Sequence, residues 1–201
     1  MKLFVTGIGT EVGKTVISAV LTEKLGADYW KPVQAGDLDN SDTMKVKELV
    51  SNSQRVFHDE GFRLNHPMSP HAAAQREGIE INLDDFKMPQ TANNLVIEGA
   101  GGLMVPLNDR DCVIDLIETL GAEVVLVSRN YLGSINHTLL SIEALKSRGI
   151  PVRGVIFNDE ENVETESVIL KMTGLKCLGR VPMIEELTSN SIAECAKGIE
   201  I

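Results

Sequence analysis

The chain has 201 residues, of which 43% are apolar, and this is enough for one α/β domain with a substantial core. It carries 19 basic and 29 acidic side chains, and the net charge of −10 argues against a nucleic-acid partner, which needs a basic face. No apolar run approaches the roughly 20 residues that cross a bilayer, so the sequence predicts no membrane anchor. Three scattered cysteines fit free thiols in a reducing cytoplasm better than a disulfide framework or a zinc site.

In chain order, short apolar runs alternate with segments of helical pattern. Residues 2–6 (KLFVT) predict a strand that enters a glycine loop, unlike a signal peptide, and residues 14–25 predict a helix. Residues 29–33 (YWKPV) predict a second strand, after which we expect an acidic loop and a helix near 42–50. Residues 94–99 (NLVIEG) predict the third strand.

The second half of the chain continues the alternation. Residues 123–128 (EVVLVS) and 152–157 (VRGVIF) predict the fourth and fifth strands, and both are apolar almost throughout. Helices are expected at 134–148 and 163–172, and residues 176–181 (KCLGRV) predict a sixth strand before a closing helix. Continuously apolar strands are typical of a parallel sheet with helices on both faces. The sequence therefore predicts a doubly wound α/β fold with ligands at the carboxyl ends of its strands.

The segment GIGTEVGKT, residues 7–15, follows the first strand and only half satisfies two phosphate-binding patterns. A dinucleotide fingerprint needs glycine where Val12 stands, and a standard P-loop needs glycine where Ile8 stands. Gly-Lys-Thr at a helix start is nevertheless the specific half of the P-loop, in which lysine reaches the terminal phosphates and threonine binds magnesium. We therefore expect these roles for Lys14 and Thr15, with an ordinary glycine turn as the alternative.

A nucleotide site of this kind needs magnesium with further oxygen ligands. Glu98 ends a predicted buried strand and leads into a glycine-rich turn, which suits a second metal contact; a carboxylate that caps a turn is the alternative. Asp42 closes the acidic loop 37–42, where acidic side chains are usually only solvated. Lys31 ends the second strand, where Pro32 stops regular pairing. A lysine in an apolar segment is costly unless it faces a charged site or lies exposed at a sheet edge.

Seven short motifs follow one another from position 3 to about position 184. They are GTEVGKT, KPVQAG, NSD, PMSPHAAA, EGAGGLMVPL, LGSINHTLL and FND. With these motifs the chain resembles the dethiobiotin synthetases, ATP-dependent enzymes of biotin synthesis whose glycine loop has this same extended form. The resemblance implies a P-loop NTPase-type domain over residues 1–201, with a mostly parallel sheet flanked by helices. It also implies a cyclo-ligase that converts 7,8-diaminononanoate, CO2 and MgATP into dethiobiotin, ADP and phosphate, through a carbamate and a carbamic–phosphoric anhydride.

The same resemblance implies roles for individual residues. The catalytic residues are Lys31 near the carbamate, Lys14, and Thr10 beside the reacting groups. Thr15, Asp42 and Glu98 are the implied magnesium ligands, and Asn158 is expected to hydrogen-bond the adenine edge. The implied ATP site comprises Glu11, Val12, Gly13, Lys14, Thr15, Val16, Asp42, Glu98, Gly99, Ala100, Gly101, Asn158, Asp159, Pro182, Met183 and Ile184.

The distal carboxylate of the diamine must also be held. The family pattern implies a homodimer with shared active sites, in which the segment LGSIN of the neighbouring subunit binds this carboxylate. Ser134 is the expected N-cap of the helix that follows, and free N–H groups at a helix start favour an anion. A simple capped helix is the alternative. At Ala35 the family often has a small hydroxyl residue, so Gln34 or a backbone N–H would replace that contact. The implied substrate residues are Ala35, Gly133, Ser134, Ile135 and Asn136.

Three other functions stay open at this point. The main alternative is a regulatory P-loop ATPase of the partitioning type, but those loops carry an additional lysine, and here Ile8 and Gly9 stand nearby. A synthetase-like domain of a corrinoid amidase would need a glutaminase domain, for which 201 residues leave no room. A nucleotide-binding module without catalysis is disfavoured by the intact Lys14, Thr15 and Glu98.

Overall fold

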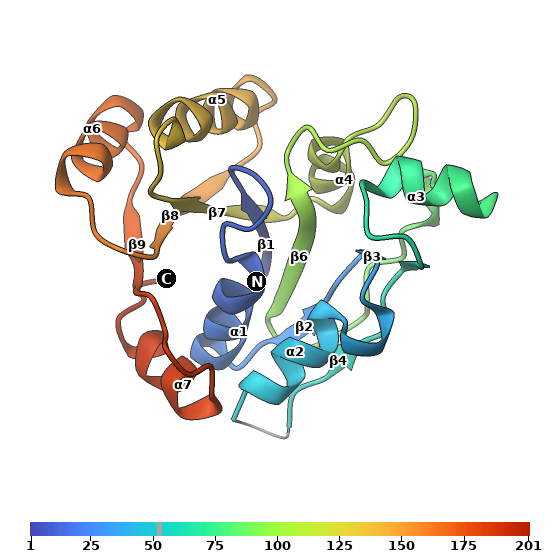
Figure 1. Cartoon of the computed structure of the whole chain (residues 1–201), viewed down its shortest axis with the longest axis horizontal. Coiled ribbons are helices and arrows are strands. Elements are labelled where there is room, and N and C mark those ends of the chain that lie inside the picture. The colour runs from blue at the N-terminus through green and yellow to red at the C-terminus, as the bar shows by residue number, and fades with distance from the viewer. Residues whose placement is uncertain (52–53) are drawn as a thin grey trace.

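Parallel strands form the central sheet of the computed structural model, which describes residues 1–51 and 54–201. Within these residues the sheet has seven strands in the order β4-β2-β6-β1-β7-β8-β9 (Figure 1). They are β1 (Lys2–Gly7), β2 (Asp28–Trp30), β4 (Phe57–His58), β6 (Leu95–Gly102), β7 (Glu123–Arg129), β8 (Val152–Asn158) and β9 (Cys177–Val181). A separate parallel pair joins β3 (Val33–Ala35) to β5 (Phe62–Leu64).

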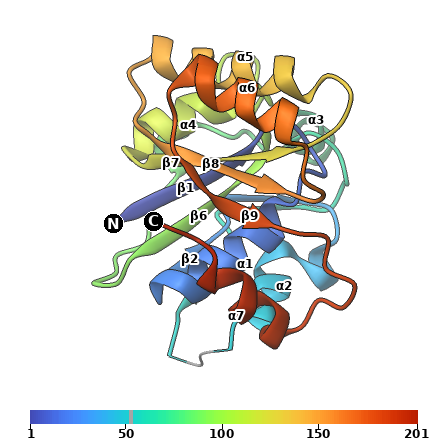
Figure 2. The same cartoon turned by 90° about the vertical axis from the view of Figure 1, so that its left-hand side faces the viewer.

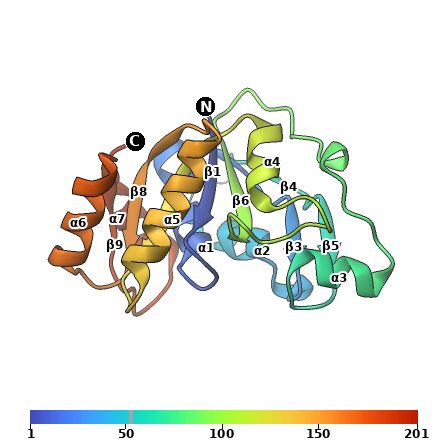
Figure 3. The ribbon, with the colours of Figure 1, turned by 90° about the horizontal axis from the view of Figure 1, so that it is seen from above.

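Helices cover both faces of the central sheet (Figure 2). One face carries α1 (Lys14–Leu25), α2 (Asp42–Leu49) and α7 (Ser189–Lys197). The other face carries α4 (Val113–Leu120), α5 (Ser134–Ser147) and α6 (Val163–Thr173). Figure 3 shows α3 (Pro70–Glu77) beside β3 and β5, at the opposite end of the molecule from α6. Two short 3-10 turns lie at Leu38–Asn40 and Leu83–Asp85.

The strands bury side chains on both faces, which explains their almost continuous apolar runs. On β1, Leu3 and Val5 pack in the cluster that contains α1, whereas Phe4 packs in the cluster on the opposite face. On β7, Val125 joins the first cluster and Val124 the second. This two-sided burial confirms the predicted doubly wound parallel fold.

Helix α1 begins and ends at glycines in the left-handed conformation. Gly13 precedes it with a φ of 91°, and Gly26 closes it with a φ of 60° while its N–H caps the last turn. A Cβ on residue 13 would also collide with the side chain of Asn158. Since only glycine tolerates both conditions, the loop between β1 and α1 is closely fixed, and Lys14 is held at the helix start.

The strand expected at 29–33 is wrong as a single element, because the structure splits it in two. β2 ends at Trp30, and β3 begins at Val33 and pairs with β5 instead of the central sheet. Pro32 lacks an N–H donor, and its carbonyl accepts a hydrogen bond from the amide of Phe62, so the chain leaves the central sheet here. The other predicted strands and helices are confirmed, with ends that differ by three residues at most.

Other elements were not predicted from the sequence. They are β4, β5, α3, α4 and the two 3-10 turns, all within the stretch before β7. In the described parts of the chain, no helix is long and apolar enough to cross a bilayer.

Candidate active site

The loop between β1 and α1 directs its two key side chains in different directions. Nζ of Lys14 turns back on the loop and donates a hydrogen bond to the carbonyl of Gly9 at 3.1 Å. Burial, opposed in part by the charge of Glu98, lowers the pKa of Lys14 to about 8. Oγ1 of Thr15 points away from the loop and donates to Oε1 of Glu98 at 2.9 Å. The loop itself turns through Glu11, whose φ of 59° lies in the left-handed region.

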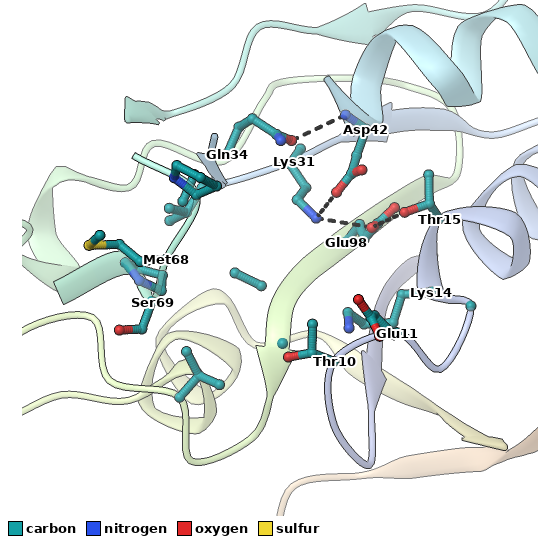
Figure 4. A pocket seen from close by; sticks show the side chains of 18 of the residues that line it. Thr10, Glu11, Lys14, Thr15, Lys31, Gln34, Asp42, Met68, Ser69 and Glu98 are labelled. Carbon is teal, nitrogen blue, oxygen red and sulfur yellow. Dashed lines mark hydrogen bonds and ion pairs between the residues drawn. The ribbon is translucent and has the colours of Figure 1, made fainter. Parts of the chain in front are cut away.

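A buried cation lies between two carboxylates next to this loop. Nζ of Lys31 is 2.6 Å from Oδ2 of Asp42 and 2.9 Å from Oε1 of Glu98, and it also donates to the carbonyl of Gly99 at 3.4 Å. With Thr15, these side chains form one group that we call the Lys31 cluster: Thr15, Lys31, Asp42 and Glu98 (Figure 4). The cluster brings together residues that are as many as 83 positions apart in the sequence.

Strand register places the Lys31 cluster. β2 and β6 pair with Tyr29 opposite Val96 and Trp30 opposite Ile97, so the next residues along these strands, Lys31 and Glu98, lie side by side. Because side chains alternate along a strand, Lys31 points to the same face as Tyr29, where α1 and α2 lie. Lys31 is therefore buried beside two carboxylates, and the alternative of exposure at a sheet edge is not observed.

Asp42 reaches the cluster from α2. Oγ of Ser41 caps this helix by accepting a hydrogen bond from the amide of Met44, so Asp42 is its first residue. The amide of Asp42 donates to Oε1 of the buried Gln34 at 3.2 Å, and Nε2 of Gln34 donates to the carbonyl of Gly36. Gln34 thus links β3 to the start of α2 and holds the backbone of Asp42 in place.

The charges of the cluster support one another. Burial works against the ammonium of Lys31, but Glu98 and Asp42 outweigh it and raise the pKa of Lys31 above its ordinary value. Burial likewise disfavours the charged form of Asp42, but Lys31 outweighs it and lowers the pKa of that carboxyl. Burial, followed by the charge of Glu98, raises the pKa of Tyr29 well above its ordinary range, so its phenol stays a neutral donor. Lys31 therefore stays an ammonium between its two carboxylate partners.

The main cavity, of about 720 Å³, opens over the Lys31 cluster and the P-loop. Of the predicted site residues, its lining includes Thr10, Glu11, Gly13, Lys14, Thr15, Val16, Lys31, Ala35, Asp42, Glu98, Ala100 and Gly101. Met68 and Ser69 face the P-loop from the other side of the cavity (Figure 4). Gln34, expected to replace the contact missing at Ala35, also lines this cavity, and the lining that was not predicted comprises Val33, Pro67, Met68, Ser69, Pro70 and Val105. Residues 67–70 belong to the motif PMSPHAAA, so the motif could have identified them.

A second cavity, of about 220 Å³, adjoins the P-loop at the ends of β8 and β9, and we call it the base cavity. It brings together the predicted residues Glu11, Gly13, Val16, Asn158, Asp159, Pro182, Met183 and Ile184, and adds Arg129 and Leu187. Nδ2 of Asn158 donates to the carbonyl of Val12 at 3.0 Å, which fixes this side chain against the loop.

Arg129 is a polar residue of the base cavity that the sequence did not single out. Its Nε donates to Oδ2 of Asp159 at 2.7 Å, and its Nη1 donates to the carbonyl of Glu11 at 3.3 Å. Both partners adopt left-handed backbone conformations, with φ of 80° at Asp159 and 59° at Glu11. Arg129 thus joins two strained turns, one in each wall of the cavity. One signal in the sequence could have identified Arg129. It stands at the carboxyl end of β7, and ligands of this fold bind at the carboxyl ends of the strands.

The start of α5 corrects one expectation about the substrate residues. Gly133, with a φ of 105°, is the N-cap, and Ser134 is the first residue inside the helix with an unpaired, buried Oγ. The predicted N-cap role of Ser134 is therefore wrong, because the left-handed cap position suits glycine. Ile135 and Asn136 are exposed. Among the residues that the structure describes, this segment lines neither the main cavity nor the base cavity.

The oxygen donors of the Lys31 cluster fit a magnesium ion that phosphates also bind. Thr15 offers a hydroxyl, Asp42 and Glu98 offer carboxylates, and the bridging ammonium of Lys31 already marks this spot as favourable for a cation. Across residues 1–51 and 54–201, no three His, Cys, Asp or Glu side chains gather in a way that could hold a metal ion by themselves. Magnesium typically needs only one or two carboxylates when phosphates complete its shell.

Comparisons with known proteins agree with this geometry. A family model described as an AAA domain matches residues 1–191. The ATP-dependent dethiobiotin synthetase BioD of Christiangramia forsetii is 57% identical, over 95% of this chain and 93% of the relative. BioD of Cytophaga hutchinsonii is 50% identical, over 97% of this chain and 95% of the relative.

Solved structures show the fold at low sequence identity. The septum site-determining protein MinD of Pyrococcus horikoshii, complexed with Mg-ADP, matches with a TM-score of 0.61 and 13% identity, over 98% of this chain and 95% of that chain. The MinC:MinD complex of Aquifex aeolicus matches with a TM-score of 0.55 and 14% identity, over 98% of this chain and 93% of that chain. These likenesses to partitioning-type ATPases concern the fold alone. Sequence relatives, in contrast, cover nearly the whole chain, and the chain belongs to the family of ATP-dependent dethiobiotin synthetases.

Proposed function

We propose that this protein forms dethiobiotin from 7,8-diaminononanoate, CO2 and MgATP, with release of ADP and phosphate. Family membership supports the reaction, and the observation that carries it to this chain is the Lys31 cluster beside Lys14 in one cavity. The reaction concentrates negative charge on carbamate and phosphoryl oxygens, which the ammonium groups of Lys14 and Lys31 and the proposed magnesium would stabilise. In this proposal the whole chain, residues 1–201, acts as one cytoplasmic synthetase domain.

ATP binding would use the P-loop. Lys14 exchanges the carbonyl of Gly9 for the β- and γ-phosphates, which is a short movement because its ammonium already lies inside the loop. Thr15, Asp42 and Glu98 would hold magnesium against the same phosphates, where the ion neutralises charge on the transferring phosphoryl group. Thr10 and Glu11, with the turn Gly99, Ala100 and Gly101, would line the path of that phosphoryl group.

Lys31 would act on the other substrate. One amine of the diamine captures CO2 as a carbamate, and a carbamate oxygen then attacks the γ-phosphorus while ADP leaves. The second amine attacks the carbonyl carbon of the resulting anhydride, the ring closes, and phosphate departs with the bridging oxygen. The ammonium of Lys31, which its carboxylate neighbours keep protonated, would stabilise the carbamate and anhydride oxygens.

The base cavity would bind adenine. Asn158 keeps Oδ1 for the amino group of the base while its Nδ2 contacts Val12. Pro182, Met183 and Ile184 supply an apolar wall, and Arg129 and Asp159 close the polar side. The cavity shares Glu11, Gly13 and Val16 with the main cavity, so one nucleotide can occupy both.

We further propose a homodimer in which the start of α5 of one subunit, Gly133 to Asn136, binds the carboxylate of the diamine held by its partner. Large apolar side chains are exposed around this segment. Exposed large side chains there are Met104, Leu132, Ile135 and Leu140. Two of them, Met104 and Leu140, line a third cavity of about 390 Å³ that also contains Thr10 of the P-loop. This apolar path toward the P-loop supports the shared site.

The test is a phosphate-release assay with MgATP, bicarbonate and the diamine. The proposal expects release that depends on the diamine and matches the dethiobiotin formed. Equal release without the diamine would favour a simple ATPase, and this is the outcome that the partitioning-type alternative predicts.

A further inference from the structure

Tyr29 is a buried polar side chain of β2 that the proposed mechanism does not use. It is fully buried, and its hydroxyl donates to Oε2 of Glu98 at 2.9 Å. Tyr29 lies opposite Val96 in the pairing of β2 with β6, and Glu98 follows two residues later on the same face. Tyr29 therefore contacts the Lys31 cluster through Glu98.

The two oxygens of Glu98 have different partners. Oε1 accepts from both Thr15 and Lys31, which lie at the proposed magnesium and carbamate positions. Oε2 has Tyr29 as its donor. The last torsion of a glutamate side chain is broad and roughly two-fold, so packing alone selects poorly between the two oxygens. A donor on one side of the carboxylate removes this ambiguity.

We propose that Tyr29 is a positioning residue, whose hydroxyl holds Oε2 of Glu98 and thereby presents Oε1 to Thr15 and to the proposed magnesium position. This inference rests on the proposed function. A tyrosine suits the task because it donates a hydrogen bond without adding a charge, so Glu98 keeps its full negative charge for the cation side. Fixing a ligating carboxylate from behind is a general way to tune a metal site.

A purely structural role is the competing explanation. The ring of Tyr29 packs in the α1 cluster and lies 6.3 Å from the ring of Phe57, so it fills core volume whatever its hydroxyl does. Both explanations predict some loss of stability when the hydroxyl is removed, because Oε2 would be left buried without a donor. The two explanations differ in whether loss of the hydroxyl weakens magnesium binding.

The experiment compares Tyr29→Phe with the wild-type protein by calorimetric titration of ADP, with and without Mg2+. The expected result is that the gain in ADP affinity from Mg2+ falls about tenfold, while the affinity of metal-free ADP is unchanged. Tyr131→Phe is the matched control. Tyr131 is the other tyrosine of the sequence, and its hydroxyl pairs with His137, away from the cluster. This control should keep the wild-type gain.

Two results would overturn the inference in different ways. An unchanged magnesium gain in folded Tyr29→Phe would leave the proposed function intact and reduce Tyr29 to a core residue. A wild-type protein without any magnesium gain would remove the metal site itself, and the proposed function would fail with the inference.

A second measurement does not depend on the folding of Tyr29→Phe. Wild-type protein labelled with 3-fluorotyrosine has two fluorine resonances, and the Tyr131→Phe variant identifies that of residue 29. Addition of Mg2+ to the ADP complex should shift the resonance of residue 29 and not that of residue 131. A resonance of residue 29 that ignores Mg2+ would contradict the inference.

Discussion

The Lys31 cluster and the base cavity, two halves of one candidate site, handle charge differently. In the cluster, Lys31 and Glu98 are 4% and 0% exposed, and their positions follow from the register of β2 and β6. In the base cavity, the side chains of the Arg129–Asp159 pair are 41% and 12% exposed, and both residues stand where strands give way to loops.

This difference sets what each half contributes. Loss of one partner of a buried ion pair costs about 3–5 kcal/mol, because the other charge is left unpaired in a poor solvent. An exposed pair contributes about 0–1 kcal/mol, since water and salt screen it. Both figures refer to the free energy of unfolding. Because the buried half also faces the reacting groups in the proposed mechanism, we expect substitutions there to affect turnover strongly, and substitutions in the exposed half to affect nucleotide affinity modestly.

Lys14→Ala should produce the largest effect. It removes the cation that meets the transferring phosphoryl group, so turnover should fall by about 100- to 1000-fold, as is typical for one such contact. The fold should survive, because the small side chain still suits the start of α1. Steady-state kinetics and circular dichroism check this, and near-wild-type ring closure by the folded variant would refute the role of Lys14.

Lys31→Gln should come next and should separate chemistry from binding. Turnover should fall by about 100-fold, because the carbamate and anhydride oxygens lose their cation. ATP affinity should change much less, since Lys31 lies on the side of the diamine. Calorimetric ATP titration beside steady-state kinetics measures both. A variant that loses ATP affinity alone would place Lys31 in the nucleotide site.

Mixed dimers extend the comparison to the partner subunit. Lys31→Ala and Asn136→Asp proteins should each be nearly inactive, but a shared site predicts that a hybrid dimer has one site with both defects and one with neither. Equal mixing should then restore about a quarter of wild-type activity. Native mass measurement verifies that hybrids form. Hybrids that restore no activity would show that each site lies within one chain.

Arg129→Ala should produce the smallest effect. ATP affinity should fall less than about fivefold, in line with an exposed ion pair, with no change in maximal turnover. Inorganic triphosphate, which has no base, should bind as it does to wild type. Arg153→Ala is the matched control, because Arg153 pairs with Glu123 across the same two strands at their other end. A large loss of turnover in Arg129→Ala but not in Arg153→Ala would contradict the claim that the base cavity affects nucleotide affinity and not turnover.

Most strands of the sheet could be predicted from the sequence because each is marked by residues within its own short segment. Glycines at 13 and 26 mark the ends of α1, and continuous apolar runs mark β7 and β8. α4 was missed, although the apolar residues of its segment VIDLIETL recur with the period of a helix and Gly121 follows its last residue. A stricter search for this periodicity would have found it. The pairing of β3 with β5 was not predictable in this way, because short strands gain their stability from partners distant in sequence.

In the candidate site, too, the residues of a local motif were predictable and those brought together by distant contacts were not. Lys14 and Thr15 belong to a local motif, and the structure places both at the start of α1 in the lining of the main cavity. Asp42 sits in an acidic loop that looks merely solvated, and only tertiary packing brings it to Lys31. Tyr29 has no sequence pattern of its own, since its role depends on the register that sets it against Glu98.

The most direct test of the proposed reaction follows one oxygen atom. Protein, MgATP and the diamine are mixed with CO2 labelled with 18O, and the products are analysed by mass spectrometry before the label exchanges with water. If a carbamate oxygen attacks the γ-phosphorus, one 18O leaves with phosphate and one stays in the carbonyl of the dethiobiotin ring. Unlabelled phosphate formed together with labelled dethiobiotin would contradict the carbamic–phosphoric anhydride, and with it the assignment of Lys31 and Lys14 to the two sides of that bond.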